Sequence, residues 1–558
     1  MNLVWTTPAI SPPKRRSVLL AALAALRYSR PSNQRQELMS LFDAQALTRL
    51  QAEFRQSMLD LLIGLCRDIE RHYAGVAAGL DLPVDYFRFL AHRLGGAACS
   101  NWKVVGWIEA LNDLVYFLDL LAQVRKERDQ RSFAEQLFAE CEQQFFENSY
   151  LNELFPLERA QARGLPGRLR RLCMRLAREV TQESLFFDPG WALEWMNRNR
   201  RRSWIVSGRL EASFERAEQA FTVPIGIDGD MLMAPPAVRR AVGRPSRPLM
   251  FLLAKDEIAL RRGRTYPLCN GRGTSMHWQW KRKESRVAAT AASGPVTIGP
   301  TLRYGKNRQP KSLSDTDARQ VARIVQAWRT IREAWPEGHA LLELLTSRII
   351  PLKASGVVSF SYRHRPGLSF LNCFERDNLD LIDDLIHENS HHHLNLLLRK
   401  HILYHGDRNQ QIFYSPWRRT LRPVRGILHA TFTFTMGALL FARLSAWAET
   451  AEGRRQWREA GLTGRHLMRA RFRCLEEIES VRYSLRDLEY ADRHLKWITV
   501  PGARLVKQLD EAIITAEHQM VLHRKAVFAS PFGAKLRQHM SQLQRARKTY
   551  GPMRIDQA

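Results

Sequence analysis

The chain has 558 residues, of which 45% are hydrophobic and 25% charged; this is the composition of a globular protein with room for two to four domains. Its formal net charge of +29 favours contact with polyanions in general, but no arginine/aromatic pattern typical of a nucleic-acid module accompanies it, so no specific nucleic-acid partner is predicted. The seven scattered cysteines include no C-x-x-C, which argues against a disulfide framework or a thiolate zinc site and indicates a cytoplasmic protein.

The amino-terminal part of the chain is predicted to be an arm followed by a helical domain. Residues 1–30 contain several prolines and a short apolar segment, Ser17–Leu26, without a clear cleavage pattern, so no secretory signal is expected. Residues 31–216 are interpreted as a helical domain, because apolar residues recur there at helical spacing. The helices expected in it are Phe42–Tyr73, Val84–Gly95, Trp107–Arg128, Phe133–Phe146 and Leu169–Phe186.

Residues 217–313 are rich in Gly and Pro and are interpreted as a mixed connecting region. Short β-like pieces stand out in it at Leu249–Leu253 and Val296–Ile298. The helical pattern returns in residues 314–558, which we expect to form a further domain that begins with helices over Ala318–Trp335 and Gly338–Ile350. The fold class predicted for the chain is mainly α (α+β).

A small β-hairpin is expected ahead of the most informative helix. Val357–Tyr362 and Leu368–Cys373 are typical of short strands, separated by a Pro-Gly turn. Asp377 or Asn378 then offers an N-cap, and no Gly or Pro interrupts the following residues up to His405. A hairpin that leads into a helix of this kind is the layout of zincin-like metal sites, so the domain is predicted to be a helical bundle with a zincin-like hairpin.

The sequence His387-Glu388-Asn389-Ser390-His391 is an H-E-x-x-H motif on that helix. Residues i and i+4 share a helix face, so both imidazoles can bind one metal ion while Glu388 lies at the same site. Residues 314–558 are therefore predicted to be an HExxH metal-binding catalytic domain. The alternative is a helix with surface histidines, which the apolar residues around the motif disfavour. His392 and His393 are expected to point away from this face.

A metal site of this type needs a third protein ligand. Leu394 and Leu397 replace the Gly and His of the metzincin continuation, which excludes that subclass. A glutamate from a later helix could serve, and the candidates are Glu449, Glu452, Glu476, Glu477 and Glu479. We favour His429, which follows Pro423 and shares a helix face with Arg425 in an otherwise apolar segment; the alternative is a hydrogen-bonded core histidine.

One segment, Ile427–Trp447, is apolar and long enough to cross a membrane. It also contains His429, Arg443 and three threonines. A buried core helix with functional polar groups fits these residues better, so no membrane span is predicted.

The chain from about 348 to 442 resembles the HExxH-type, α-ketoglutarate-dependent peptide β-hydroxylases of bacterial natural-product clusters. The residues that carry the resemblance are Ile349–Leu352, the strand pair, Asp384–His391, Tyr414–Arg418 and Arg422–His429. They cover about a sixth of the sequence. The paired histidines after His391 and the strong basicity depart from the pattern.

The resemblance implies iron(II) bound by His387, His391 and His429, with open positions for α-ketoglutarate and oxygen. A three-histidine site departs from the usual two-histidine, one-carboxylate triad. A guanidinium suits the far carboxylate of α-ketoglutarate, and Arg418, Arg422 and Arg425 are the candidates. Glu388 would orient ligands or handle a proton, and the substrate would be a ribosomally made precursor peptide (RiPP biosynthesis).

Two other functions remain open. A zinc metallopeptidase would use Glu388 to activate a zinc-bound water. A basic, non-enzymatic binding protein would use its histidines only structurally. The sequence does not indicate the oligomeric state.

Overall fold

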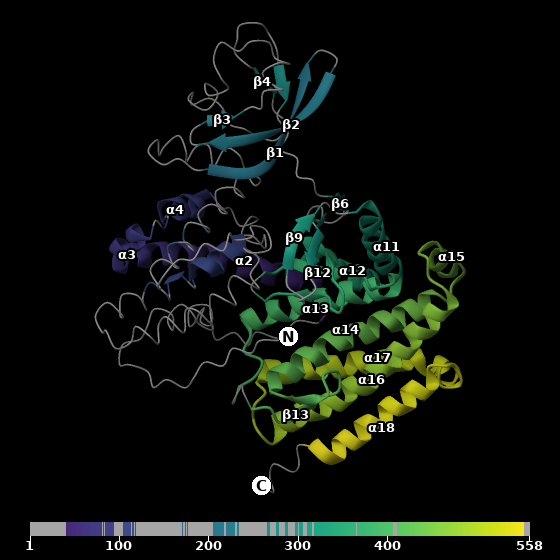
Figure 1. Ribbon diagram of the computed structural model, residues 1–558. Helices are drawn as coiled ribbons and strands as arrows, with labels where there is room; N and C mark the ends of the chain where they lie inside the picture. Colours follow the sequence, from purple (N-terminus) through teal and green to yellow (C-terminus); the bar gives the residue numbers. More distant parts are fainter. Residues whose placement is uncertain are drawn as a thin grey trace. The chain divides into compact units, whose positions relative to one another are not determined.

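The structure is a computed structural model (Figure 1). It describes residues 41–80, 84–93, 104–112, 317–363, 365–405 and 410–551, with shorter pieces at 82, 114–115, 118, 170, 173, 176, 205–216, 219–228, 231–233, 265–267, 275–277, 285–287, 296–299, 301–304 and 310–314. The chain divides into two compact units, one of which holds residues 55–284 and the other residues 285–558 together with the chain up to Phe54.

The unit of residues 55–284 contains helices and two small sheets. Helix α2 (Ala44–His72) begins in the other unit and continues into this one, and α3 (Ala74–Gly79) and α4 (Val84–Arg93) follow it. Strands β1 (Ile205–Arg216), β2 (Gln219–Asp228) and β3 (Met231–Met233) form an antiparallel sheet in chain order. The short strands β4 (Thr265–Pro267) and β5 (Ser275–His277) pair separately.

The predicted helices of this unit are confirmed in part. The helices over Phe42–Tyr73 and Val84–Gly95 correspond to α2 and α4, and the described residues between 104 and 118 are helical. The helix over 133–146 and the β-like piece over 249–253 lie outside the described residues. The extension of the helical domain to residue 216 is wrong for β1. Its apolar residues at 206, 210, 212 and 214 follow a period of two, which is the spacing of a strand.

The second unit is built around a sheet of seven strands. Its central strand β10 (Arg348–Lys353) pairs in parallel with β12 (Leu368–Asn372) on one side and with β7 (Val296–Ile298) and then β8 (Thr301–Tyr304) on the other. Strands β11 (Phe360–Ser361), β6 (Ser285–Val287) and β9 (Pro310–Ser314) pair antiparallel with β12, β7 and β8. Because β7 ends before β8 begins, Pro351 of β10 lies at the break between them, where a missing N–H is tolerated.

The predicted hairpin before the helix of the H-E-x-x-H motif is present, with a shorter first strand. Phe360 pairs with Phe370 and Ser361 with Ser369. Gly367, just before β12, has φ +85°, and a Cβ there would lie 2.7 Å from Ser347 Oγ, so the turn requires glycine.

The two helices predicted before the hairpin are also found. Helices α11 (Ala318–Ala334) and α12 (Pro336–Leu345) correspond to them. The second prediction is wrong beyond Leu345, because Arg348–Ile350 belong to β10, where they are buried between neighbouring strands.

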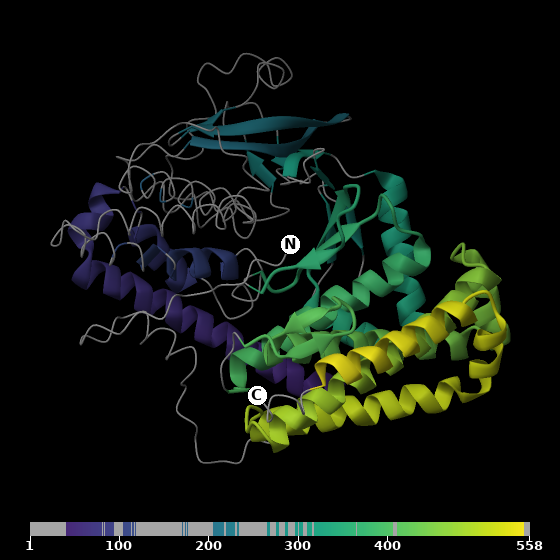
Figure 2. The same ribbon diagram turned by 60° about the horizontal axis from the view of Figure 1, so that its bottom comes forward.

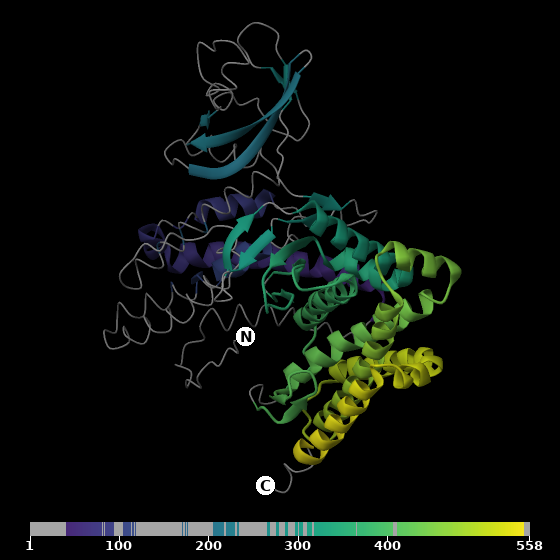
Figure 3. The same cartoon turned by 45° about the vertical axis from the view of Figure 1, so that its right-hand side comes forward.

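Long helices complete this unit. Helices α13 (Asn378–Lys400) and α14 (Val424–Trp447) pack together, and α14 packs on α16 (Gly464–Arg493) and α17 (Val500–Ala529). Helix α18 (Gly533–Tyr550) packs on α16 and α17, while the short α15 (Ala451–Glu459) follows α14. Figures 2 and 3 show α14, α16, α17 and α18 side by side in both orientations. The predicted mainly α fold with a small β part is confirmed.

The chain after α13 is joined to the chain before α17. His405 N donates to Trp497 O at 2.6 Å, and Thr499 N donates to Leu403 O at 3.1 Å. A Cβ at Gly502 would lie 1.9 Å from Leu403 O, so only glycine allows this approach. We call this contact between residues 403–405 and 497–502 the clasp.

Within the described part of the chain, α14 is the one helix that is long and apolar enough to cross a membrane. Of its most apolar stretch, 78% is buried inside the protein. Its threonines 431 and 435 donate to backbone carbonyls one turn earlier, at 2.8 and 2.7 Å. The burial and these hydrogen bonds are typical of a core helix. The length and apolar composition of α14 alone are weak evidence for a membrane span.

Candidate metal centre

Helix α13 begins with a capping box. The Asp377 carboxylate accepts from Asp380 N at 3.0 Å, and the Asp380 carboxylate accepts from Asp377 N at 3.1 Å. Arg469 of α16 bonds both carboxylates and attaches this end of α13 to the bundle. The helix runs without interruption to Lys400, so its H-E-x-x-H residues keep regular helical spacing.

Helices α13 and α14 bring the three predicted imidazoles together. The rings of His387 and His391 have centroids 5.0 Å apart, and those of His391 and His429 have centroids 6.3 Å apart. All three side chains keep partial access to solvent, unlike Glu388, His392 and His393, which are buried. The three rings therefore lie where α13 and α14 pack together.

Metal geometry can be compared with these spacings. A metal–nitrogen bond of about 2.0–2.1 Å places each ring centroid about 3.2 Å from the ion, so two rings at a tetrahedral angle are about 5.2 Å apart. The spacing of His387 and His391 fits this value, and His429 is about 1 Å too far. Among the residues described, no three His, Cys, Asp or Glu side chains are already close enough to hold an ion. His429 would have to move closer to His391 to bind the same ion.

The environment keeps these imidazoles neutral. Burial lowers the pKa of His387, an effect that Arg473 and Arg418 reinforce and Asp383 opposes. Burial and the neighbouring histidines lower the pKa of His391 well below its usual value. Burial, with the positive charge of Arg363 and Arg425, lowers the pKa of His429 to about 4. Neutral nitrogen donors are the form that a divalent transition metal binds.

Glu388, which follows His387 on α13, is a buried carboxyl group. Burial raises its pKa to about 8, and the carboxylates of Asp384 and Asp383 act in the same direction, while the Ser361 hydroxyl opposes them. Its Oε2 has no hydrogen-bond partner among the described residues. The group is therefore able to hold or release a proton near neutral pH.

Three arginines lie in the segment that leads into α14 and in its first turn: Arg418, Arg422 and Arg425. The hairpin of β13 (Phe413–Ser415) and β14 (Thr420–Arg422) leads directly into α14, whose N-cap is Pro423. The positive charge of Arg418 lowers the pKa of His391, and that of Arg425 lowers the pKa of His429. Burial lowers the pKa of Arg422, and the charges of Arg418 and Arg425 lower it further.

These three guanidinium groups repel one another. No carboxylate within the described ranges forms an ion pair with Arg418, Arg422 or Arg425, although most arginines of α16 have such a partner. Clustered cations without a counter-charge favour an anion.

The glutamates that were alternative ligands have other partners. Glu449, Glu452, Glu476, Glu477 and Glu479 each form an ion pair with an arginine. His429 is thus the candidate that lies beside the H-E-x-x-H rings.

Residues that the sequence reasoning missed support the site from outside. Arg473 of α16 forms ion pairs with Asp383 at 3.4 Å and with Glu477 at 2.8 Å. Glu477 accepts from Trp417 Nε1 at 2.8 Å, and Trp417 stacks on Phe434, whose ring meets His387 edge-on at 5.2 Å. Asp383 lies one helical turn before His387, so the spacing in the sequence could have indicated that the two side chains share a helix face.

His392 and His393 have structural positions. His392 Nδ1 accepts from Gly367 N at 3.4 Å, which leaves Nε2 as the donor to Ser369 Oγ at 3.1 Å. His393 packs edge-on against Phe432, and neither ring nitrogen has a hydrogen-bond partner among the described residues. Both point away from the His387 and His391 face, as expected.

Comparison of the sequence with models of known protein families and with curated proteins finds no match.

Proposed function

We propose that the protein is an Fe(II)- and α-ketoglutarate-dependent hydroxylase that acts on side chains of a ribosomally made precursor peptide in the cytoplasm. The observation that carries the proposal is the meeting of His387, His391 and His429 near three arginines that have no carboxylate partner among the described residues. The resemblance of the same segments to peptide β-hydroxylases adds to it.

The residues fit such a centre by chemistry and position. The three imidazoles would hold the metal, with other coordination positions left for small molecules. When bound, iron(II) and α-ketoglutarate supply the oxidation: one atom of O₂ enters a peptide C–H bond and the other enters succinate, with loss of CO₂.

The chain's own residues would bind and orient the reactants. Arg418 and Arg425, whose charges act on His391 and His429, would take the far carboxylate of α-ketoglutarate through paired N–H groups. Glu388 would hold a proton beside the rings, and Trp417 and Phe434 would exclude water from the side facing His387.

The test is anaerobic addition of Fe(II) and α-ketoglutarate to the full chain, followed by visible spectroscopy. A weak charge-transfer band is expected in the native protein and in His393→Gln, and its loss is expected in His391→Ala. Absence of the band, together with no succinate formation when a cognate peptide is supplied, would overturn the proposal.

A zinc metallopeptidase is the second candidate, and the buried Glu388 carboxyl favours it. A carboxyl group whose pKa is raised toward neutrality suits a general base that takes a proton from a zinc-bound water. Peptide cleavage restored by Zn(II) and lost in Glu388→Gln would establish this function. Salt-sensitive polyanion binding without stoichiometric metal would instead indicate a basic binding protein.

A further inference from the structure

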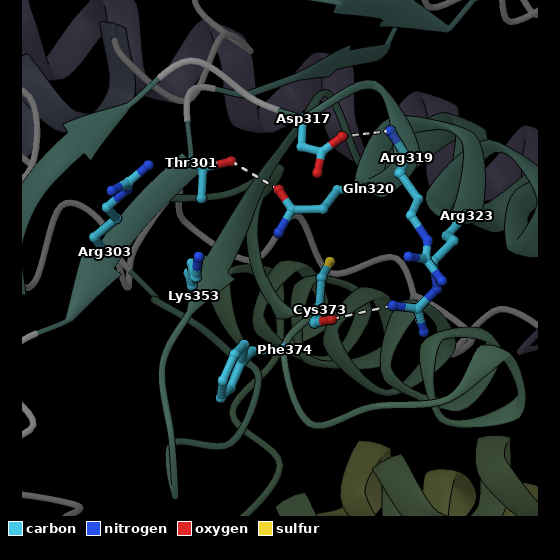
Figure 4. Close-up of a pocket in the computed structure, with 9 residues that line it drawn as sticks. All are labelled: Thr301, Arg303, Asp317, Arg319, Gln320, Arg323, Lys353, Cys373 and Phe374. Carbon is cyan, nitrogen blue, oxygen red and sulfur yellow. Dashed lines mark hydrogen bonds between the residues drawn. The ribbon is translucent and has the colours of Figure 1, made fainter.

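A basic pocket lies in the unit of residues 285–558, lined by residues other than the three imidazoles and Arg418, Arg422 and Arg425. Its volume is about 420 Å³, within the range of small-molecule sites. Its lining residues are Thr301, Arg303, Asp317, Arg319, Gln320, Arg323, Lys353, Cys373 and Phe374. Figure 4 shows Arg303 and Lys353 on one side, with Arg319 and Arg323 on the opposite side.

The topology of the sheet explains where this pocket lies. Strands β8, β10 and β12 are parallel neighbours, and their carboxyl ends deliver Arg303, Lys353 and Cys373. The amino end of α11 closes the other side with Arg319. The space beyond the carboxyl ends of parallel strands is where open sheets with helices bind ligands.

The charge of the pocket is strongly positive. Four cations line it against a single carboxylate, that of Asp317. This carboxylate accepts from Arg319 N at 2.8 Å as the N-cap of α11, so the helix end is already satisfied and the side-chain cations define the pocket. Arg303 and Lys353 are direct register partners on adjacent strands, an arrangement in which like charges repel.

Arg323 is held in place by neutral groups. Its guanidinium donates to Cys373 O at 3.1 Å, to Asn378 Oδ1 at 3.0 Å and to Arg376 O. These partners fix its direction without neutralising its charge. The aromatic ring of Phe374 is 56% exposed at the rim of the same pocket, where a planar group can stack on it.

We infer that this pocket binds a small phosphate-bearing anion, with Arg319, Arg323 and Lys353 on its phosphate groups. Guanidinium and ammonium groups on two sides of one pocket match a group with several charged oxygens. The volume exceeds that of a single phosphate, which leaves space beside Phe374 for an aromatic group such as a nucleobase. This binding site is additional to the proposed hydroxylase function.

The experiment is titration calorimetry on the full chain at about 0.15 M salt, which screens exposed charges beyond about 8 Å. The probes are ADP, inorganic pyrophosphate and adenosine. ADP and pyrophosphate are expected to bind and adenosine is not. The double variant Arg319→Glu/Lys353→Glu is expected to weaken binding of both phosphate probes at least tenfold.

Matched variants separate this site from general basicity. The pair Arg493→Glu/Lys507→Glu makes the same charge change on exposed residues of α16 and α17, and it should leave the affinities within twofold. Phe374→Ala distinguishes the two sources of phosphate. A loss of affinity for ADP but not for pyrophosphate identifies a nucleotide site. Affinities for both probes equal to those of the native protein identify a site for the phosphate groups alone.

Three results would overturn the inference. The first is that neither phosphate probe binds. The second is that the pocket and control variants lose affinity for the probes equally. The third is that Arg425→Gln, and not the pocket variant, weakens binding of the probes. Binding of an octaglutamate peptide that depends on Arg319 and Lys353, without binding of either phosphate probe, would also overturn it and assign the pocket to acidic peptides.

Discussion

The indole of Trp417 lies parallel to the ring of Phe434, with centroids 4.3 Å apart and an interplanar angle of 5°. Trp417 comes from the turn between β13 and β14, whereas Phe434 belongs to α14. The stack therefore fixes the turn that carries Arg418 against the helix that carries His429. Arg419, which closes this turn, has φ +54°, an uncommon conformation for a residue with a side chain.

Replacing Trp417 should loosen this turn. Trp417→Ala removes the stack and the hydrogen bond to Glu477, and we expect a loss of about 2–4 kcal/mol in the free energy of unfolding. Trp417→Phe keeps a ring for stacking and should lose only about 1 kcal/mol. Urea denaturation of both variants measures the difference, and equal losses would show that stacking does not hold the turn.

Removing one imidazole should impair metal binding selectively. In His429→Ala we expect the affinity for Fe(II) or Zn(II) to fall more than tenfold, because a third nitrogen donor is lost. His393→Gln is the control, since His393 packs on Phe432 and points away from the site. Metal content after dialysis, measured by elemental analysis, separates the two. Equal metal content in both variants would remove His429 from the ligand set.

Neutralising the arginines beside the imidazoles should affect α-ketoglutarate more than metal. Arg418→Gln and Arg425→Gln are expected to weaken α-ketoglutarate binding about ten- to hundredfold, the value of hydrogen bonds to a charged group. Arg419→Gln is the matched control, because the charge of Arg419 acts on Tyr414, Glu476 and His539. Titration of the charge-transfer band gives the affinities, and a similar effect of all three substitutions would indicate general electrostatics.

The buried Asp384 should make stability depend on pH. Burial, with the negative charge of Asp383, raises the pKa of Asp384 from 3.8 to about 7, although Arg376 and the Ser359 hydroxyl favour its ionised form. Between these values the folded protein binds more protons than the unfolded chain, so stability falls as pH rises from about 4 to 7. The contribution is of order 2–4 kcal/mol.

Asp384→Asn tests this pH dependence. The variant keeps an oxygen that can accept from Ser359, but it has no charge to titrate. Urea denaturation at pH 5 and pH 8 should show a smaller stability loss in the variant than in the native protein. The same slope with pH in both proteins would contradict the assignment.

Local signals in the sequence predicted the elements of the site. The helix start at Asp377 followed from capping chemistry, and the order of hairpin, metal-binding helix and His429 helix followed from periodicity and turn residues. Residues i and i+4 of one helix face are fixed by helix geometry alone. That α14 would turn His429 toward His391 was a hypothesis based on the cost of burying an imidazole in an apolar segment.

Long-range pairing was beyond such signals. Residues 348–350 continue the apolar pattern of α12, and only their partners in β7 and β12 make them a strand. The ion pair of Asp383 with Arg473 joins residues 90 positions apart, so spacing along the chain could not indicate it. The basic pocket is likewise assembled from four separate segments, whose common location is set by the parallel register of β8, β10 and β12.

The clasp has a consequence for dissection of the protein. Residues just after α13 are hydrogen-bonded to Trp497 and Thr499, so residues 405–497 form a ring, that is, a segment whose two ends are joined by backbone hydrogen bonds. Both imidazole-bearing helices meet this ring: α14 lies within it and α13 ends at its closure. A shortened protein that stops before Trp497 would open the ring and leave the carboxyl end of α13 to fray, even though every proposed metal ligand would still be present in the polypeptide.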